Sequence, residues 1–218
     1  IDFSSFSGDQ SHLVLLVHGV KDDTQSWIRP LKWSYKNYLK PEQVQALDWS
    51  AYAQNPMRCA IDASRIGARV GSALTLNKNL NSIHLIAHSC GGFVIYAACK
   101  IIKSSNKNIV VQTTYLAPVS IYGVAWNYGA DHFGSCADYS EAYIDADDSV
   151  MGSNRLLLHN TRTYDITNVR TRTSSSVHPH NWPTTYYHQF PTQNIAPNYL
   201  LDRALLESKP QGALDPAE

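Results

Sequence analysis

The stretch "SIHLIAHSCGGFVIYAACK", residues 82–100, decides the fold. Its first seven residues are mostly apolar and β-branched, which predicts a buried strand. Residues from Gly91 to Ile102 carry apolar side chains at helical spacing, which predicts a helix. Ser89 lies at the junction between the two, among small residues. Packing alone gives no reason for a serine at such a junction, so Ser89 is a candidate functional residue.

The rest of the chain continues the alternation of strands and helices. Further strands are predicted at 12–19, 44–49, 108–118 and 155–166, and further helices at 22–39, 57–80 and 198–208. Segments 121–154 and 171–191 are predicted as loop, the first with a short helix. Strands that alternate with helices form parallel sheets covered on both faces. The expected fold is therefore a three-layer α/β/α sandwich around a mostly parallel sheet.

Composition limits the classes of function. The chain has 218 residues, 44% of them hydrophobic, which suits one domain spanning residues 1–218. Its 18 basic and 18 acidic residues cancel and form no basic block, so the charge pattern of a nucleic-acid-binding protein is missing. No apolar run approaches the roughly 20 residues that span a bilayer. The polar start, "IDFSSFSGDQ", has no signal-peptide pattern.

Four cysteines allow three disulfide connectivities. Cys90 and Cys99 fall in one predicted helix, roughly 13 Å apart along its axis, which is too far for a bridge between them. A bridge between Cys59 and Cys136 and a set of four free thiols both stay open. The compartment and the oligomeric state are left open as well.

The residues around Ser89 follow the pattern of a nucleophile elbow, G-x-S-x-G, which is a sharp turn between a strand and a helix. Small residues are required two positions before and after the serine, where strand and helix pass closely. Gly91 meets this requirement, and Ala87 replaces the first glycine. The turn would lift the Ser89 hydroxyl above the carboxyl edge of the sheet. Cys90 is set aside as a rival nucleophile because the serine holds the apex.

Two backbone N–H groups are candidates for an oxyanion hole. The N–H of Cys90 opens the helix after the serine. The N–H of Val20 follows Gly19 in "VHGV", directly after the first predicted strand. His88 is expected to be a packed core histidine, and His18 is expected to support the oxyanion loop.

The segments "AHSCGG" and "VHG" resemble the α/β-hydrolase superfamily, and within it the small lidless bacterial lipases and esterases. The likeness is firm from residue 12 to about residue 98 and loose from 109 onward. It implies a serine hydrolase that cleaves carboxylic esters without a metal or organic cofactor.

The same resemblance implies that an acid and then a histidine follow the serine in the chain. Asp165 ends the predicted strand 155–166 and is the chosen acid. Asp131 and the acidic run Asp145, Asp147 and Asp148 compete with it, the run being interpreted as a solvated face.

Three histidines could act as the base. "HNWPTTYY" is similar to the region around the catalytic histidine of some secreted lipases, which favours His180 over His178 and His188. The pair in "HPH" also suggests a metal, but a third ligand at sensible spacing is absent, so no metal is expected.

The substrate is predicted to be a small-molecule ester or a lipid. The segment 121–151 is a candidate cap over the pocket. Four aromatic residues are candidate substrate contacts: Trp27, Tyr122, Trp126 and Trp182. A thioesterase, acyltransferase or peptidase could use the same triad, and a non-catalytic binding protein of this fold is the alternative from another class.

Overall fold

A computed structural model describes residues 1, 6, 10–153, 157–189 and 214–216. The described strands are β1 (His12–Val17), β2 (Val44–Leu47), β3 (Ser82–His88), β4 (Val110–Leu116), β5 (Tyr139–Ile144), β6 (Arg162–Asp165) and β7 (Leu214–Pro216). The described α-helices are α1 (Ile28–Tyr35), α2 (Cys59–Leu74), α3 (Gly91–Ser105), α4 (Tyr128–His132), α5 (Thr167–Thr173) and α6 (Trp182–Gln189).

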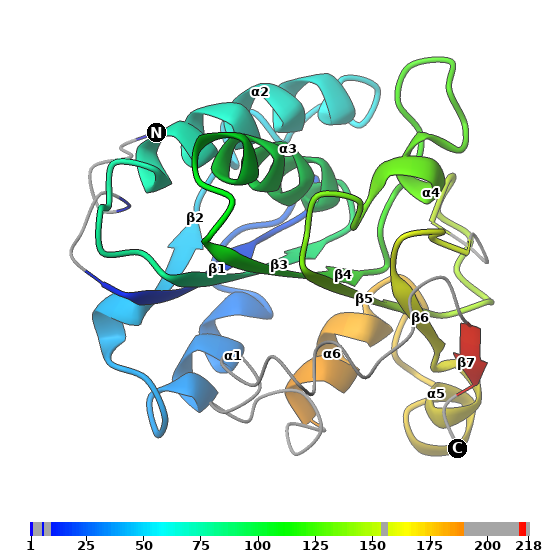
Figure 1. Cartoon of the computed structure of the whole chain (residues 1–218). Helices are drawn as coiled ribbons and strands as arrows, with labels where there is room; N and C mark the ends of the chain where they lie inside the picture. The colour runs from blue at the N-terminus through cyan, green and yellow to red at the C-terminus, as the bar shows by residue number, and fades with distance from the viewer. Residues whose placement is uncertain (2–5, 7–9, 154–156, 190–213, 217–218) are drawn as a thin grey trace.

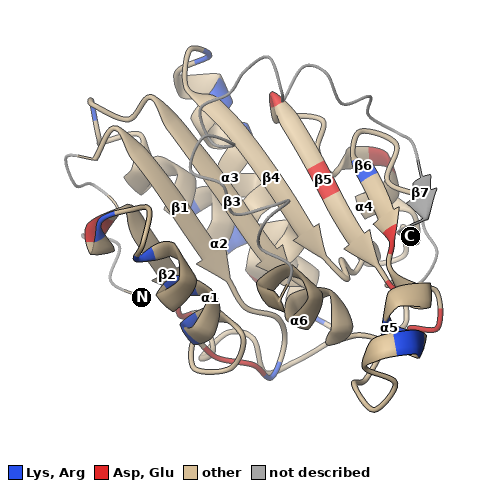
Figure 2. Cartoon of the chain, turned by 90° about the horizontal axis from the view of Figure 1, so that it is seen from below, with Lys and Arg blue, Asp and Glu red and all other residues tan. Residues whose placement is uncertain are grey.

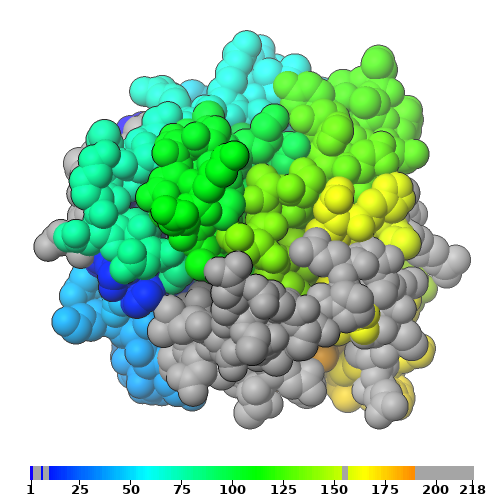
Figure 3. Space-filling view, in the orientation of Figure 1, coloured from blue at the N-terminus to red at the C-terminus, as the bar shows by residue number. Residues whose placement is uncertain are grey.

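The described strands form one sheet in the order β2-β1-β3-β4-β5-β6-β7, and each neighbouring pair is parallel. Helices α2 and α3 cover one face, and α1 and α6 cover the other (Figure 1). The outer surfaces of α2 and α3, cyan to green, lie side by side in Figure 3. The predicted α/β/α sandwich is confirmed. No helix in the described ranges is long and apolar enough to cross a membrane.

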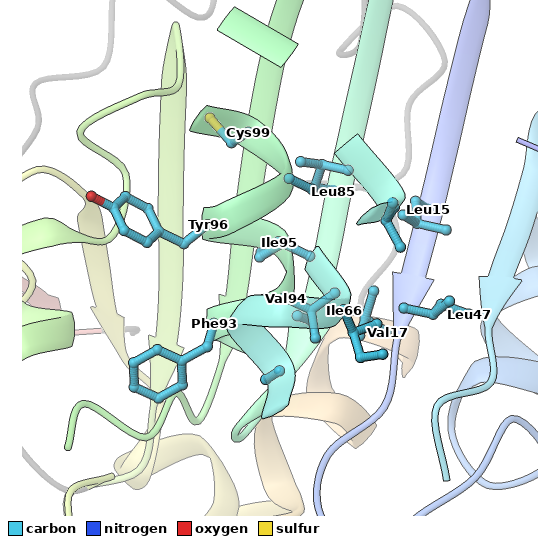
Figure 4. Packing of buried hydrophobic residues seen from close by; sticks show 14 of the residues in the cluster. Leu15, Val17, Leu47, Ile66, Leu85, Phe93, Val94, Ile95, Tyr96 and Cys99 are labelled. Carbon is cyan, nitrogen blue, oxygen red and sulfur yellow. The ribbon is translucent and has the colours of Figure 1, made fainter. Parts of the chain in front are cut away.

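The sheet separates two hydrophobic cores. On one face, Leu15, Val17 and Leu85 from β1 and β3 point toward Ile66 of α2 and Val94 of α3 (Figure 4). Gly67 allows α2 to approach α3 closely, because a Cβ there would lie 2.2 Å from the carbonyl oxygen of Val94. The second core packs α1 and α6 against the opposite face of the sheet. Both cores include side chains of β3, and β3 ends at His88, directly before Ser89.

Several elements differ from the sequence prediction. Strand β5 lies inside the segment predicted as loop, and so does helix α6. The candidate cap 121–151 contains helix α4 and the interior strand β5. The predicted strand 155–166 is shorter, with β6 limited to Arg162–Asp165, and the predicted helix 198–208 lies outside the described residues.

Two disulfides fasten helix α3. Cys59 at the start of α2 bonds to Cys90, and Cys99 bonds to Cys136 after α4. Both open alternatives from the sequence, a Cys59–Cys136 bridge and four free thiols, are wrong. The exclusion of a Cys90–Cys99 pair is confirmed.

Candidate active site

Ser89 occupies a strained turn between β3 and α3. Its φ is +55°, in the left-handed region that non-glycine residues rarely adopt. The turn is enforced by close backbone packing. A Cβ on Gly91 would lie 2.7 Å from the carbonyl oxygen of His18, and a Cβ on Gly19 would lie 2.8 Å from the Cβ of Ser89. The predicted elbow context, a strand followed by a helix with glycines at the crossing, is present.

A chain of hydrogen bonds joins three side chains at this turn. His180 Nε2 lies 3.0 Å from Ser89 Oγ, and His180 Nδ1 lies 2.7 Å from Asp148 Oδ2. Ser153 Oγ lies 3.3 Å from the same Nδ1 and 3.0 Å from the carbonyl oxygen of Ala117. A carboxylate on Nδ1 fixes that nitrogen as the protonated one, which leaves Nε2 free to accept the serine proton.

The prediction of Asp165 as the partner of the histidine is wrong. The Oδ1 atom of Asp165 instead accepts hydrogen bonds from the backbone N–H and the hydroxyl of Thr167, at the start of α5. The carboxylate that bonds to His180 is that of Asp148. Asp148 lies in the loop after β5, a strand that the sequence prediction missed and that precedes β6 in the chain. The interpretation of the acidic run as a solvated face fails at Asp145 and Asp148, which are both buried.

His180 is the histidine that reaches the serine. His178 Nδ1 accepts a hydrogen bond from the backbone N–H of His180 at 3.2 Å. His188 lies on α6 and lines the cleft in front of Ser89. The sequence likeness thus selected the histidine that the structure places against Ser89.

His88 is buried, as expected, but it also contacts His180. Its Nε2 lies 3.0 Å from the carbonyl oxygen of His180, so this nitrogen donates a proton. Its Nδ1 is buried without a hydrogen-bond partner among the described residues, 4.0 Å from Asp22 Oδ2. Burial, and secondarily the charge of nearby His180, lower the pKa of His88 to about 4. The imidazole of His88 is therefore neutral around pH 7.

The pKa of Asp148 lies below its ordinary value. Burial alone would raise it, but hydrogen bonds from His180 and Ser153 stabilise the charged form and outweigh burial. Asp148 is therefore ionised across the physiological range, as a carboxylate that orients a histidine must be.

The two predicted oxyanion donors both lie beside the serine. Cys90 caps α3, and Val20 follows the turn at Gly19 and lines the cleft. Within the described part of the chain, neither backbone N–H has a hydrogen-bond acceptor. His18 supports this loop from below, as expected: the backbone N–H of Trp49 donates to its Nε2, and its Nδ1 lies 2.9 Å from the carbonyl oxygen of Gly19.

A cleft of about 500 Å³ opens in front of Ser89. Its lining comprises Val20, Lys21, Asp22, Ser26, Trp27, Pro30, His88, Ser89, His180, Asn181, Thr184, Thr185 and His188. Most of these side chains are polar, which distinguishes the cleft from the mostly apolar pockets typical of small-molecule sites.

Of the four aromatic residues predicted to contact substrate, Trp27 lines this cleft. Trp182 is fully buried, with its indole N–H bonded to the carbonyl oxygen of Ile166. Tyr122 packs against Phe93, and Trp126 is exposed away from the cleft lining. The structure therefore does not bring Trp182, Tyr122 or Trp126 to the described cleft.

The parallel sheet, the strained serine turn and the Ser–His–Asp chain together define an α/β-hydrolase. The family model described as "Putative serine esterase (DUF676)" matches residues 7–122, and the chain belongs to this family. The matched range covers the first four strands, the serine turn and helix α3. A search of curated proteins found no match.

Two solved structures resemble the chain. A putative hydrolase of the alpha/beta superfamily from Xanthomonas campestris pv. campestris is 11% identical, with a TM-score of 0.47, over 84% of this chain and 99% of that one. Aspergillus fumigatus lipase B is 11% identical, with a TM-score of 0.41, over 72% of this chain and 45% of that one. The family assignment identifies the protein as a hydrolase.

Proposed function

We propose that the protein hydrolyses carboxylic esters through a catalytic triad of Ser89, His180 and Asp148. The observation that carries the proposal is the continuous hydrogen-bond chain from the serine hydroxyl through the imidazole to a buried carboxylate. Serine is a weak nucleophile unless a base takes its proton, and this chain supplies both the base and the group that orients it.

The reaction proceeds in two halves. Ser89 Oγ attacks the ester carbonyl carbon while His180 Nε2 takes the hydroxyl proton, and the carbonyl electron pair moves onto oxygen. The N–H groups of Val20 and Cys90 stabilise that oxyanion. Collapse breaks the bond to the alcohol, which takes the proton from His180 and leaves an acyl group on Ser89. Water then repeats the sequence, releasing the carboxylic acid and restoring the serine.

The polar cleft favours short or hydrophilic esters over long-chain lipids within the active site. A long acyl chain is bound tightly only where a continuous apolar channel buries it, because each buried CH₂ group contributes about 0.8 kcal/mol of binding free energy. We therefore expect kcat/KM for p-nitrophenyl esters to be highest for acetate or butyrate and to fall for longer acyl chains.

Ser89→Ala tests the proposal. It is expected to lower kcat on p-nitrophenyl acetate by on the order of 10⁴-fold or more and to abolish labelling by a fluorophosphonate probe. Wild-type protein that does not react with the probe would show a binding protein of this fold in place of an enzyme.

Asp148→Asn and Asp165→Asn form a matched pair that tests which carboxylate belongs to the triad. Because Asp148 orients the imidazole, its replacement should lower kcat by on the order of 10⁴-fold. Asp165→Asn should keep most of the activity, since Asp165 bonds only to the start of α5 in the described structure. The reverse ranking of the two variants would remove Asp148 from the mechanism.

A further inference from the structure

The outer face of α1 and the turn after it carry a local excess of positive charge. Residues 24–41 contain Arg29, Lys32, Lys36 and Lys40 and no Asp or Glu, and all four basic side chains are exposed. The chain as a whole is neutral, with 18 basic and 18 acidic residues, so this excess is specific to the segment. Figure 2 shows the basic positions of α1 in blue, on the sheet face that α1 shares with α6.

Exposed aromatic side chains accompany these charges. Trp33 is 68% exposed and Tyr38 is 55% exposed. The ammonium group of Lys36 lies 3.1 Å from the centroid of the Trp33 ring. An exposed indole next to cations is the combination found where proteins meet lipid headgroups.

A groove of about 560 Å³ runs beside the same residues. Its apolar walls are Ile28, Leu39, Val44 and Ala46, while Arg29, Lys32, Trp33 and Lys36 border it. No carboxylate is among the described residues that line it. The groove therefore combines an apolar interior with a cationic edge, which is complementary to an anionic headgroup that carries an acyl chain.

We propose that this basic face, defined by Arg29, Lys32, Trp33, Lys36 and the adjoining groove, binds the surface of anionic lipid membranes. The four cations would attract an anionic surface, and Trp33 would insert at the headgroup level. An acidic protein would also complement the charge, but it would not require an exposed indole beside an apolar groove. Binding of this kind is independent of the proposed ester hydrolysis.

The location of the basic face adds a consequence for activity. Trp27 and Pro30, at the N-terminal end of α1, line the cleft of Ser89, while the basic face occupies the other side of the same helix. Docking through α1 would therefore leave the cleft, on the opposite side of the helix, open to the short or hydrophilic esters proposed above.

The test is co-sedimentation of the full chain with vesicles of phosphatidylcholine alone and of phosphatidylcholine with phosphatidylserine. We expect binding to the anionic vesicles only, weakening as NaCl is raised. Lys32→Gln/Lys36→Gln should lower the partition coefficient by roughly 25-fold, from a factor of about five for each cation near the surface. Ser89→Ala should bind like the wild type, which separates this inference from the proposed catalysis.

Matched controls make the result specific. Lys78→Gln/Lys107→Gln removes the same charge from exposed lysines elsewhere and should retain binding. Trp33→Ala should weaken binding, while Trp126→Ala, which removes another exposed tryptophan, should not. Equal losses in the paired variants, or equal binding to both kinds of vesicle, would overturn the proposal. Binding to polyglutamate without binding to vesicles would identify an acidic protein partner instead, and would also overturn it.

Discussion

His88 contacts the backbone of His180, the proposed base. Its Nε2–H donates to the carbonyl oxygen of His180, and its ring lies 4.8 Å from the His180 ring, centroid to centroid. Replacing it with phenylalanine keeps the aromatic volume but removes the donor and leaves that carbonyl without this partner. We expect His88→Phe to lower kcat by roughly tenfold to a hundredfold, because a shift of about 1 Å in the base is enough for such a loss.

His84 provides the control for His88. It is buried on the same strand, four residues earlier, and bonds to Thr114 rather than to the site. His84→Phe should lower the unfolding temperature with little change in kcat, whereas His88→Gln, which keeps an N–H donor, should recover part of the activity. Equal kcat for His88→Phe and wild type would show that His88 only fills space.

The two buried histidines also predict how stability depends on pH. Burial lowers the pKa of His84 to about 3, and burial together with His180 lowers that of His88 to about 4, from an ordinary value of 6.5. Between pH 6.5 and 4 the unfolded chain binds protons at these positions and the folded chain does not, so the unfolding free energy falls as pH falls. The slope should reach up to about 1.4 kcal/mol per pH unit for each histidine.

Urea unfolding at pH 4.5, 5.5, 6.5 and 7.5 measures this slope. His84→Gln should reduce it, while His159→Gln, which changes an exposed histidine, should leave it unchanged. A flat profile in wild-type protein over this range would contradict the assignment of both histidines as buried and neutral.

At the scale of single elements, β5 explains where prediction from sequence succeeded and failed. The strand–helix pattern and the serine turn could be predicted, because β1 and β3 are mostly apolar. Strand β5 reads "YSEAYI", and its buried Ser140 and Glu141 hide the apolar signal. Those polar groups are satisfied by Thr113 and Thr114 on the neighbouring strand β4, a cross-strand match that only the folded sheet reveals.

The missed strand displaced the predicted acid. Because β5 is predicted as loop, the next predicted strand after 108–118 ends at Asp165. The sequence therefore predicts the acid at the end of β6 instead of in the loop after β5. The histidine was found because a local sequence likeness, rather than element counting, located it. The aromatic substrate contacts were predicted from residue type and place in the sequence, which carry no information on the direction of a side chain.

Helix α5 anchors the loop that carries Asp148. Arg170 of α5 bonds through Nε to Asp145 and through Nη2 to Asp147, the latter at 2.7 Å. Arg170 and Asp145 are both buried, so removing the guanidinium leaves an unpaired buried carboxylate. We expect Arg170→Gln to lower the unfolding free energy by about 3 kcal/mol and to reduce kcat, because the acid loop loses its anchor.

Arg172 on the same helix is the matched control. It is exposed, and its Nε bonds only to the carbonyl oxygen of Asn168. Arg172→Gln should change the unfolding free energy by less than about 0.5 kcal/mol and leave kcat unchanged. Guanidinium unfolding and ester hydrolysis, measured on both variants, compare the two positions, and similar losses in the two would argue against the anchoring role of Arg170.

At the scale of the whole molecule, helix α3 is covalently tied to elements before and after it in the chain. The Cys59–Cys90 bond closes a sequence separation of 31 residues and the Cys99–Cys136 bond one of 37. In the chain-entropy model, each bond stabilises the folded state by about 4 kcal/mol, because it restricts the unfolded chain. Cys99→Ala/Cys136→Ala should therefore lower the guanidinium midpoint clearly while keeping kcat, since Cys99 lies more than two helical turns beyond the serine.

Cys59→Ala/Cys90→Ala should lower both stability and activity, because Cys90 directly follows Ser89 and its N–H is a proposed oxyanion donor. The backbone of the turn is strained at Ser89, and removing the bond to α2 frees one side of it. The expected signature is a loss in kcat at temperatures well below the unfolding transition, which stability alone cannot produce. If both double variants lose stability equally and neither loses kcat under those conditions, the packing around Gly19 and Gly91 is sufficient to hold the turn without the disulfide.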